Sequence, residues 1–457
     1  MTSNITTEEE AGKTTIVMER DRMDLRDLVT SATARIRCEF QGGKETPRKT
    51  YYPPSQGRRG RDSAPSAQRS ATTTESAPAS GKRSRSPGTP TSRRNQEDDP
   101  AMKWTRPLNS WNKVSTKFGL DKSRYEDFKF LMYLDIEDPY IQNYVNYTIG
   151  IERPKIVGKL KAHLHFWKEI HAPDEILNII EKGFEIPFIS KPPPIYLPNN
   201  KSALERKHRP WIMETLREFL DYGFISKVET VPYCVLPLQI AVHPTKLSLI
   251  HDESILNDYV IKNRFKLEAW EPMFYNSLGA KYGIQFDLKK FYFHIPIHPD
   301  FKKYFGFSFK MNENESVTYF IFNTMPYGYT RAPLIARNLI KPLVKRWRKM
   351  NMQISVFFDD GFAVGSDRKK LKNDSIQILC DLLRAGLIPG LEKCYWEPQK
   401  RLKWIGLLWD FEIHGISITE RRIEKLMEKL KFTLNKWPHV TYREISSING
   451  TINSMYP

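Results

Sequence analysis

The chain has 457 residues, of which 40% are hydrophobic and 12% aromatic. This length allows two to four domains, and the apolar content excludes a chain that is disordered throughout. A formal net charge of +18 favours an anionic partner, and nucleic acid is the first to consider, although acidic proteins and anionic membranes also attract basic proteins.

Residues 1–100 are predicted to form a disordered basic region rich in Ser, Pro and Arg. Between residues 51 and 100 there is almost no large apolar side chain, so this stretch cannot bury enough surface to offset the entropy lost on ordering. Its densest basic part, residues 81–94, could be a nuclear localisation signal, a nucleic-acid tether or a solvated spacer.

No signal peptide, membrane-spanning segment or membrane partner is predicted. The amino terminus lacks the apolar core of a signal peptide, and no apolar run approaches the ~20 residues that span a bilayer. The cysteines are too far apart for a zinc knuckle or a disulfide framework, and they indicate reduced thiols: Cys38, Cys234, Cys380 and Cys394. We therefore expect a soluble nuclear or cytoplasmic protein.

Aromatic and aliphatic residues become frequent after residue 100, which places the folded part there. An amphipathic helix is predicted over residues 204–222, with Gly223 as its stop. Apolar runs rich in β-branched residues predict strands at 231–242, 247–250, 284–287 and 354–358, and helical spacing predicts helices at 332–350 and 370–385. This alternation indicates an α+β fold with helices packed on one face of a sheet.

The most informative segment is residues 354–366, where two strand-like runs flank Asp359, Asp360 and Gly361. At a hairpin turn two neighbouring carboxylates can project near one another, and their repulsion favours bound divalent cations. The alternative is an ordinary Asp-Gly turn with solvated acids.

A third carboxylate, Asp287, ends the run 284–287, and Tyr292 follows five residues later. Taken singly, Asp287 could be a strand-end cap and Tyr292 a core aromatic residue. Together, the three acids suit two Mg²⁺ ions, with Mn²⁺ as an alternative ion. In nucleotidyl transfer one ion lowers the pKa of a primer 3′-hydroxyl and the other neutralises triphosphate charge.

The order of these blocks resembles the fingers and palm of reverse transcriptases. The segment with Asp287 and Tyr292 looks like the first catalytic block, and MPYGYTRAP, at 325–333, looks like the next one. FFDD, at 357–360, matches the aromatic-x-Asp-Asp block. Further along, GLIPGLEKCYWEP resembles the Gly and Lys block, and LKWIGLLWD resembles the primer-grip hairpin.

The resemblance implies a role for individual residues. The catalytic residues that it implies are the metal ligands Asp287, Asp359 and Asp360, and a proton donor near the triphosphate, Lys393. The nucleotide-binding residues that it implies are Lys246, Tyr292, Tyr327, Gly328 and Phe358, with Tyr292 screening the sugar 2′ position. The primer-grip residues that it implies are Trp404 and Gly406.

The resemblance also implies an α+β right-hand polymerase fold. Fingers and palm are expected at 187–411, after a helical region at 101–186 and before the start of a thumb or connection at 412–457. The implied partners are an RNA template, a DNA primer and deoxynucleoside triphosphates. No ribonuclease H or recombinase residues are expected after 457, so these activities would lie on a separate chain, or the reading frame is truncated.

One position departs from the family pattern. The family commonly has an Arg shortly before the acid that corresponds to Asp252, and Ser248 stands in its place. Lys246 could supply the positive charge, but it lacks the planar fork of a guanidinium group.

Residues 157–188 narrow the resemblance to the reverse transcriptase of DIRS-type retrotransposons, which mobilise with a tyrosine recombinase. The likeness is carried by Leu160, Trp167, Gly183 and Phe188. The alternative is simple core packing of two helices.

The expected function is therefore that of an RNA-directed DNA polymerase of a retrotransposon. One alternative is a catalytically inactive, co-opted or truncated remnant that only binds nucleic acid, which Ser248 motivates. Another is a polymerase that copies RNA into RNA, although a bulky Tyr292 should clash with a 2′-hydroxyl group.

Overall fold

The computed structural model describes residues 106–151, 155–243, 246–268, 270–311, 316–390, 393–436 and 439–455. These residues all belong to one unit, which spans Thr91–Pro457. The predictions for residues 1–100, including the basic cluster at 81–94, lie outside the described residues. Among the described residues, no helix has both the length and the apolar character needed to cross a membrane.

Short helices fill the region before residue 186, as predicted. Polar caps begin several of them, since the Ser110 hydroxyl accepts from the Lys113 amide and Asp138 accepts from the Tyr140 amide just before a helix that starts with Pro139. The helical elements are α2 (Trp111–Phe118), η3 (Lys122–Arg124), α3 (Tyr125–Phe128), η4 (Lys129–Tyr133), α4 (Pro139–Thr148), α5 (Lys159–Ala162), α6 (Leu164–Glu169) and α7 (Asp174–Lys182).

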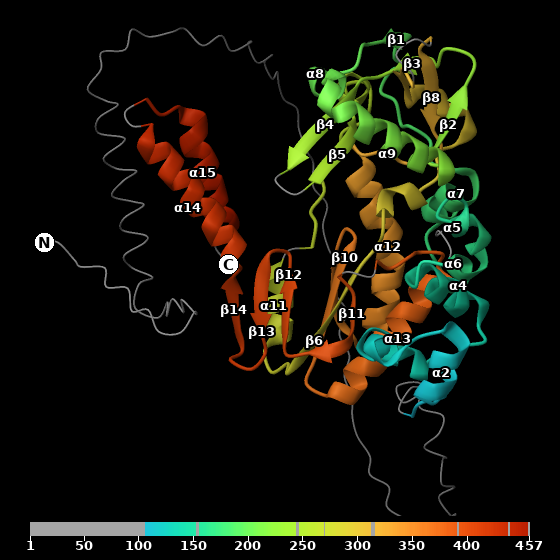
Figure 1. Cartoon of the computed structure of the whole chain (residues 1–457), viewed down its shortest axis with the longest axis vertical. Helices are drawn as coiled ribbons and strands as arrows, with labels where there is room; N and C mark the ends of the chain where they lie inside the picture. Colours follow the sequence, from blue (N-terminus) through green and yellow to red (C-terminus); the bar gives the residue numbers. More distant parts are fainter. Residues whose placement is uncertain are drawn as a thin grey trace, which may run out of the picture. The chain divides into compact units, whose positions relative to one another are not determined.

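These helices pack on the end of α13 (Arg368–Arg384), as Figure 1 shows for α4 and α6. Trp167 is fully buried, and its indole N–H donates to the Ala385 carbonyl at 2.9 Å. His163 Nδ1 donates to the Arg384 carbonyl at 2.8 Å. Both contacts satisfy carbonyl groups that the last turn of a helix leaves without an intrahelical partner, so the early region is packed on the later part of the chain.

We expect Trp167→Ala to lower the free energy of unfolding by about 3–5 kcal/mol, because it removes a large buried ring and the bond to Ala385. Trp167→Phe keeps most of the apolar contact and should cost only about 1–3 kcal/mol for the unpaired carbonyl. Urea unfolding of both variants measures the difference. Equal losses of unfolding free energy in the two variants would show that packing of the ring is not the main contribution of Trp167 to stability.

A five-stranded sheet and a hairpin form the next part of the chain. The sheet has the order β1 (Ile195–Tyr196), β3 (Cys234–Val235), β7 (Gly306–Phe309), β8 (Thr318–Phe322) and β2 (Ile225–Val228). The hairpin pairs β4 (Leu238–His243) with β5 (Lys246–His251). The predicted strand 231–242 is thus two strands, because Pro237 lacks the N–H that a continuous ladder needs.

The predicted helix 204–222 is wrong at its start. The structure has α8 (Lys201–Leu204), a 3₁₀ turn η5 (Arg206–His208) and then α9 (Arg209–Asp221), with Pro210 in the first turn of α9. Proline disfavours helical geometry in the residue before it and lacks the N–H that a helix continuing from the amino-terminal side would need. The predicted stop is confirmed, since Gly223 follows α9 with a φ of +72°.

A four-stranded antiparallel sheet carries the predicted acids. Its order is β11 (Tyr395–Gln399), β6 (Tyr282–Asp287), β10 (Asp360–Gly365) and β9 (Gln353–Phe357). Two long helices, α12 (Ala332–Lys349) and α13, pack on one face of it, as predicted (Figure 1). The predicted strands 284–287 and 354–358 and helices 332–350 and 370–385 are therefore confirmed to within a few residues.

The opposite face of this sheet packs on a second apolar cluster. Phe362 of β10 stacks on Trp404 with ring centroids 5.0 Å apart. The cluster joins the sheet to α11 (Trp270–Ser277) and to a three-stranded sheet of β12 (Arg401–Trp404), β13 (Leu407–Asp410) and β14 (Gly415–Ile418).

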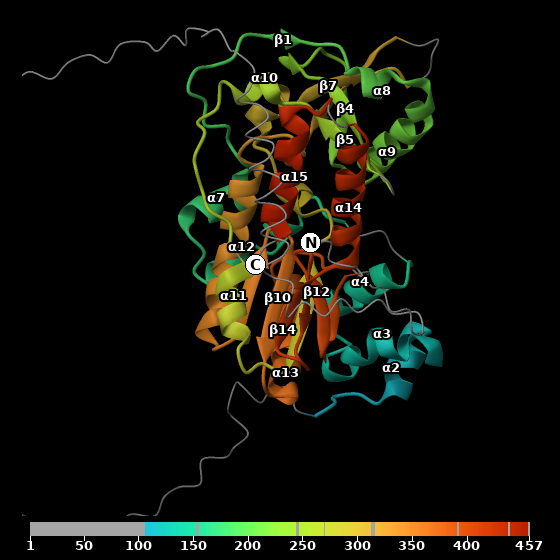
Figure 2. The same ribbon diagram turned by 90° about the vertical axis from the view of Figure 1, so that its left-hand side faces the viewer.

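Two helices end the described chain, α14 (Glu420–Asn435) and α15 (Tyr442–Met455). They run side by side, as both views show (Figure 1, Figure 2). The assignment of residues 412–457 to the start of a thumb or connection stays a prediction. The remaining short elements are α10 (Ser254–Asn257), η6 (Phe291–His294) and η7 (Pro299–Tyr304).

Candidate active site

The three predicted acids meet at one edge of the four-stranded sheet. Asp287 is the last residue of β6 and Asp360 the first of β10, and the two are direct partners in the antiparallel register. Asp359 precedes Asp360, and its carbonyl accepts from the Leu288 amide at 2.8 Å. The fold thus brings together acids that lie far apart in the sequence.

The turn between β9 and β10 consists of Phe358 and Asp359, because Phe357 pairs with Asp360. Phe358 has a φ of +58°, a region that favours glycine, so the turn is strained. Gly361 is inside β10, where a Cβ atom would lie 2.1 Å from the Phe286 ring. The alternative of an Asp-Gly turn with solvated acids is therefore wrong: the glycine serves close packing within the strand.

Burial and mutual repulsion disfavour the charged forms of these acids. Burial raises the pKa of Asp360 to about 7. A hydrogen bond that Gln285 Nε2 donates to Asp360 Oδ1 at 3.1 Å has the opposite, smaller effect and lowers the pKa. Burial, followed by the charge of Asp287, raises the pKa of Asp359. A bound cation would stabilise the charged carboxylates, because its positive charge offsets both their burial and their mutual repulsion.

Lys393 supplies one positive charge at this edge. Its Nζ donates to Asp287 Oδ1 at 2.9 Å, and this bond raises the pKa of Lys393 while two thirds of the side chain stays exposed. The predicted proton donor therefore lies beside the predicted acids.

The residues suit a divalent cation by their chemistry, because carboxylate oxygens are the ligands that Mg²⁺ and Mn²⁺ prefer. In the part of the chain that the structure describes, no group of three or more His, Cys, Asp or Glu side chains is arranged to hold a metal ion. Lys393 instead pairs with Asp287 Oδ1. Binding by all three acids thus stays a prediction.

We expect the pKa of Asp360 to make the metal-free protein less stable at pH 8 than at pH 5. The carboxyl group ionises near pH 4 in an unfolded chain but near pH 7 in the folded one, so unfolding releases a proton between these values and stability falls as pH rises through this window. Asp360→Asn removes the titrating group. In urea unfolding with chelator present, the variant should gain stability relative to the parent between pH 5 and pH 8, and a constant difference would refute the raised pKa.

Two predicted nucleotide-binding tyrosines lie beside the acids. The rings of Tyr292, on η6, and Tyr327 have centroids 5.0 Å apart with their planes at 64°. Burial, followed by the charge of Asp359, raises the pKa of Tyr292 to about 12, and the same two causes raise the pKa of Tyr327. Both phenols therefore stay protonated and close to the aspartates.

Gly328 is held where no larger residue fits. Its φ is +126°, and a Cβ atom would lie 1.9 Å from the His251 carbonyl oxygen. Asn257 binds this turn on both sides, since its Nδ2 donates to the Gly328 carbonyl at 3.0 Å and its Oδ1 accepts from the Thr330 amide at 2.9 Å. Residues 252–257 are thus joined directly to the predicted nucleotide-binding turn.

Lys246 and Ser248 are not joined to this group. Lys246 begins β5 opposite His243 with an exposed side chain, and Ser248 lies opposite Ala241. Within the described residues, no hydrogen bond or ion pair links Lys246 to another predicted site residue. Its role as a substitute for the missing Arg stays a prediction.

The predicted primer-grip residues lie at the β12–β13 hairpin. Trp404 is fully buried, and its indole N–H donates to the Asp360 carbonyl at 3.2 Å. This bond links the hairpin to the edge of the sheet where the acids lie. Gly406 has a φ of +77°, and a Cβ atom there would lie 2.5 Å from the Arg422 guanidinium.

Two further residues lie at this edge that were not predicted from the sequence, Gln285 and Cys394. Gln285 is two residues before Asp287 and so shares its face of the strand, a periodicity that could have indicated it. The Cys394 Sγ accepts from the Asp287 amide at 3.3 Å, and burial raises the pKa of its thiol to about 12. The contact of Cys394 crosses between strands and has no local signal.

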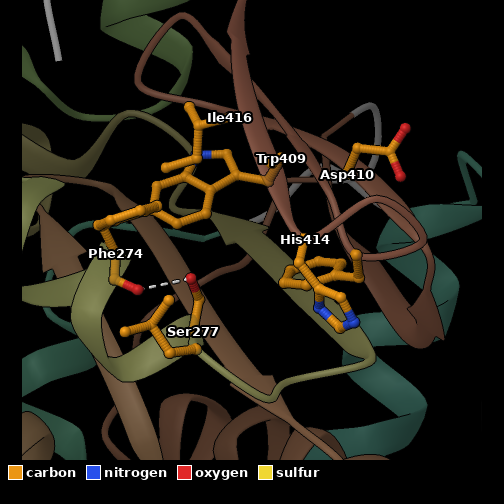
Figure 3. Close-up of a pocket in the computed structure, with 9 residues that line it drawn as sticks. Phe274, Ser277, Trp409, Asp410, His414 and Ile416 are labelled. Carbon is orange, nitrogen blue, oxygen red and sulfur yellow. Dashed lines mark hydrogen bonds between the residues drawn. The ribbon is translucent and has the colours of Figure 1, made fainter.

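A small pocket lies elsewhere, between α11 and the β13–β14 hairpin (Figure 3). None of the predicted site residues is among the described residues that line it. Its labelled lining residues are Phe274, Ser277, Trp409, Asp410, His414 and Ile416.

Comparisons with known proteins bear on the same part of the chain. Residues 247–408 match the family described as "Reverse transcriptase (RNA-dependent DNA polymerase)". The chain is 24% identical over 280 residues to a polyprotein of Cassava vein mosaic virus that is described as enzymatic. This match covers 60% of the chain and 39% of the polyprotein, so the chain spans about two fifths of that relative.

Solved structures of a foamy viral protease-reverse transcriptase are also similar to the chain. The one in complex with dsDNA has 18% sequence identity and a TM-score of 0.45, and it covers 63% of this chain and 61% of that one. The one in complex with an RNA/DNA hybrid has 17% identity and a TM-score of 0.45, covering 63% and 39%.

The family match includes every predicted site residue except Lys246. It also includes all four strands of the acid-bearing sheet and the two helices that cover it, α12 and α13. The predicted α+β fold is confirmed by the described sheets and helices.

Proposed function

We propose that the chain is an RNA-directed DNA polymerase of a retroelement, which adds deoxynucleotides to a primer 3′-hydroxyl by two-metal-ion catalysis. The observation that carries this proposal is the register of β6 and β10, which sets Asp287 opposite Asp360 with Asp359 in the adjoining turn. The match of residues 247–408 to the reverse transcriptase family supports it.

In this proposal the three aspartates hold the metal ions. When bound, two divalent ions supply a lowered pKa at the primer 3′-hydroxyl and neutralise charge on the triphosphate. Lys393 is exposed, protonated and 2.9 Å from Asp287 Oδ1, so it can turn toward a triphosphate and donate a proton there. Trp404 holds the primer-grip hairpin against Asp360.

The proposed sugar filter is the ring of Tyr292, which is packed edge-on against Tyr327. We expect Tyr292→Ala to lower discrimination against ribonucleotides by about 10-fold or more, because the space for a 2′-hydroxyl group is opened. Tyr292→Phe keeps the ring and should keep the discrimination. The ratio of kcat/KM for a deoxynucleotide and its ribonucleotide measures the effect. An unchanged ratio in Tyr292→Ala would contradict the assignment and would reopen a polymerase that makes RNA.

A second candidate function is nucleic-acid binding without catalysis. It is favoured by the pairing of Lys393 with Asp287 and by Ser248 on β5, where the family commonly has Arg. The net charge of +18 suits either candidate.

Primer extension separates the two candidates. Purified full-length chain is incubated with a DNA primer on an RNA template, deoxynucleotides and Mg²⁺ or Mn²⁺, while template binding is titrated against salt. Template-dependent extension supports the polymerase. Salt-sensitive binding without extension under either ion refutes it and supports the remnant.

The finer assignments belong to this proposal as well. A DIRS-type element would use a separate or linked tyrosine recombinase, and a ribonuclease H would act on the copied RNA template. A nuclear or cytoplasmic site of action fits the proposed template and primer. The location of a fluorescently tagged chain in cells, with and without residues 81–94, tests the nuclear assignment.

A further inference from the structure

A buried acid and histidine lie next to the predicted nucleotide-binding turn. His251 ends β5, and its Nδ1 is 3.0 Å from Glu253 Oε1, with both side chains fully buried. His251 Nε2 is 3.1 Å from the Gly306 carbonyl of β7. Neither residue is among the predicted site residues, and no step of the proposed reaction uses them.

The hydrogen-bond partners of this pair determine where its protons lie. A carbonyl oxygen only accepts, so His251 Nε2 carries a proton and donates it to Gly306. The bond to Glu253 is then made either by a charged imidazolium and carboxylate or by a neutral imidazole and carboxylic acid. Both forms hold one proton between Nδ1 and Oε1, so the bond persists in either state.

The backbone of His251 contacts the nucleotide-binding turn on two sides. Its amide donates to the Tyr327 carbonyl at 3.2 Å. Its carbonyl oxygen occupies the space that a Cβ atom at Gly328 would need. A shift of His251 therefore moves Tyr327, whose ring lies against Tyr292.

The charge of Glu253 also acts on Tyr329, at the other end of the turn. The charge of Glu253 and burial both raise the pKa of the Tyr329 phenol, with burial the larger cause. Glu253 Oε2 and the Tyr329 hydroxyl are both buried and lack a hydrogen-bond partner among the described residues.

We propose that the buried His251–Glu253 pair is a positioning element for the incoming nucleotide, because it holds the Tyr327–Gly328 turn against Tyr292. This inference rests on the proposed function. The residues act through the turn and do not touch the substrate.

Three variants of Glu253 test this role. Glu253→Met keeps a long unbranched side chain and removes the hydrogen bond, whereas Glu253→Gln can donate its amide to a neutral His251 Nδ1 and restore the bond. Glu253→Ala also removes the bond and reports whether the volume of Met matters. The matched control is Glu185→Ala, which breaks an exposed His–Glu contact with His298.

In primer extension by the full chain, we expect Glu253→Met to raise KM for the deoxynucleotide by about 10-fold, the loss typical of one hydrogen bond to a charged group, with little change in primer-template affinity. Glu253→Gln should return KM close to the parental value, and Glu185→Ala should match the parent. An unchanged KM in Glu253→Met, or no recovery in Glu253→Gln, overturns the proposal.

Amide hydrogen exchange provides a readout that does not need activity. The His251 and Thr330 amides donate across the turn, to the Tyr327 carbonyl and to Asn257 Oδ1. They should exchange faster in Glu253→Met than in the parent, Glu253→Gln or Glu185→Ala. If the parent extends no primer, the proposed function fails. Faster exchange in Glu253→Met would still show that the pair holds the turn in place. Unchanged exchange overturns it.

Discussion

Replacing Asp360 by Asn abolishes most primer extension, with an expected fall in kcat of at least about 100-fold to 1000-fold. Metal-assisted charge stabilisation contributes several kcal/mol to such a reaction, and about 1.4 kcal/mol corresponds to a tenfold change in rate. Asp287→Asn and Asp359→Asn should have comparable effects, because all three residues share one corner of the sheet. Single-turnover extension with saturating deoxynucleotide measures the change.

The fold should survive these substitutions. Asn retains the volume of Asp, and in Asp360→Asn the side-chain amide oxygen can still accept the bond that Gln285 donates to the carboxylate of the parent. Removal of divalent ions with a chelator should abolish extension by the parent in the same way, and restored Mg²⁺ should recover it.

The matched control is Asp300→Asn, which changes an exposed acid on η7 that lies next to His298. It should extend primers at the parental rate. Full activity in Asp360→Asn would contradict the metal site, and equal loss in the control would point to a general effect of charge.

Replacing Gly328 by Ala is expected to have the second largest effect. The added Cβ atom would lie 1.9 Å from the backbone oxygen of His251, and the φ of +126° is itself unfavourable for any residue with a Cβ. The turn must therefore move away from β5, which breaks the bonds that Asn257 makes to Gly328 and Thr330. We expect a loss of about 3 kcal/mol or more in unfolding free energy, or at least about a 100-fold rise in KM for the deoxynucleotide.

Gly450 on α15 is the matched control for this substitution. A Cβ atom there would meet nothing within 4 Å, and Ala is the better helix former by about 1 kcal/mol. Gly450→Ala should therefore be neutral or stabilising in thermal unfolding. Parental stability and KM in Gly328→Ala would show that the turn is not held against His251.

Local patterns were sufficient to predict the two long helices beside the candidate site and the strands that carry its acids. The apolar spacing of residues 332–350 specifies α12 and that of 370–385 specifies α13, because one helical face must be buried. Two other predicted elements were too long, because each contains a proline, Pro210 or Pro237. The hydrophobic pattern continues past each proline, but the missing N–H group interrupts the backbone hydrogen bonds.

The acids of the candidate site could also be identified from the sequence. Asp287 ends an apolar strand, and Asp359 with Asp360 follows another, so an antiparallel pairing of the two strands brings them together. The sequence alone could not decide between a metal site and an Asp-Gly turn. The strand register excluded the Asp-Gly turn, because Phe357 pairs with Asp360 and places Gly361 in the strand.

What the sequence by itself determined is the long elements around the acids and the presence of the carboxylates at the ends of strands, since periodicity and motif spacing are properties of neighbouring residues. Only the tertiary structure decided which distant groups support them. Trp167 meets the end of α13, which is distant in the sequence, and Glu253 is paired with His251 against the Tyr327–Gly328 turn. Such contacts depend on packing between segments, and no local pattern of residues specifies packing at that range.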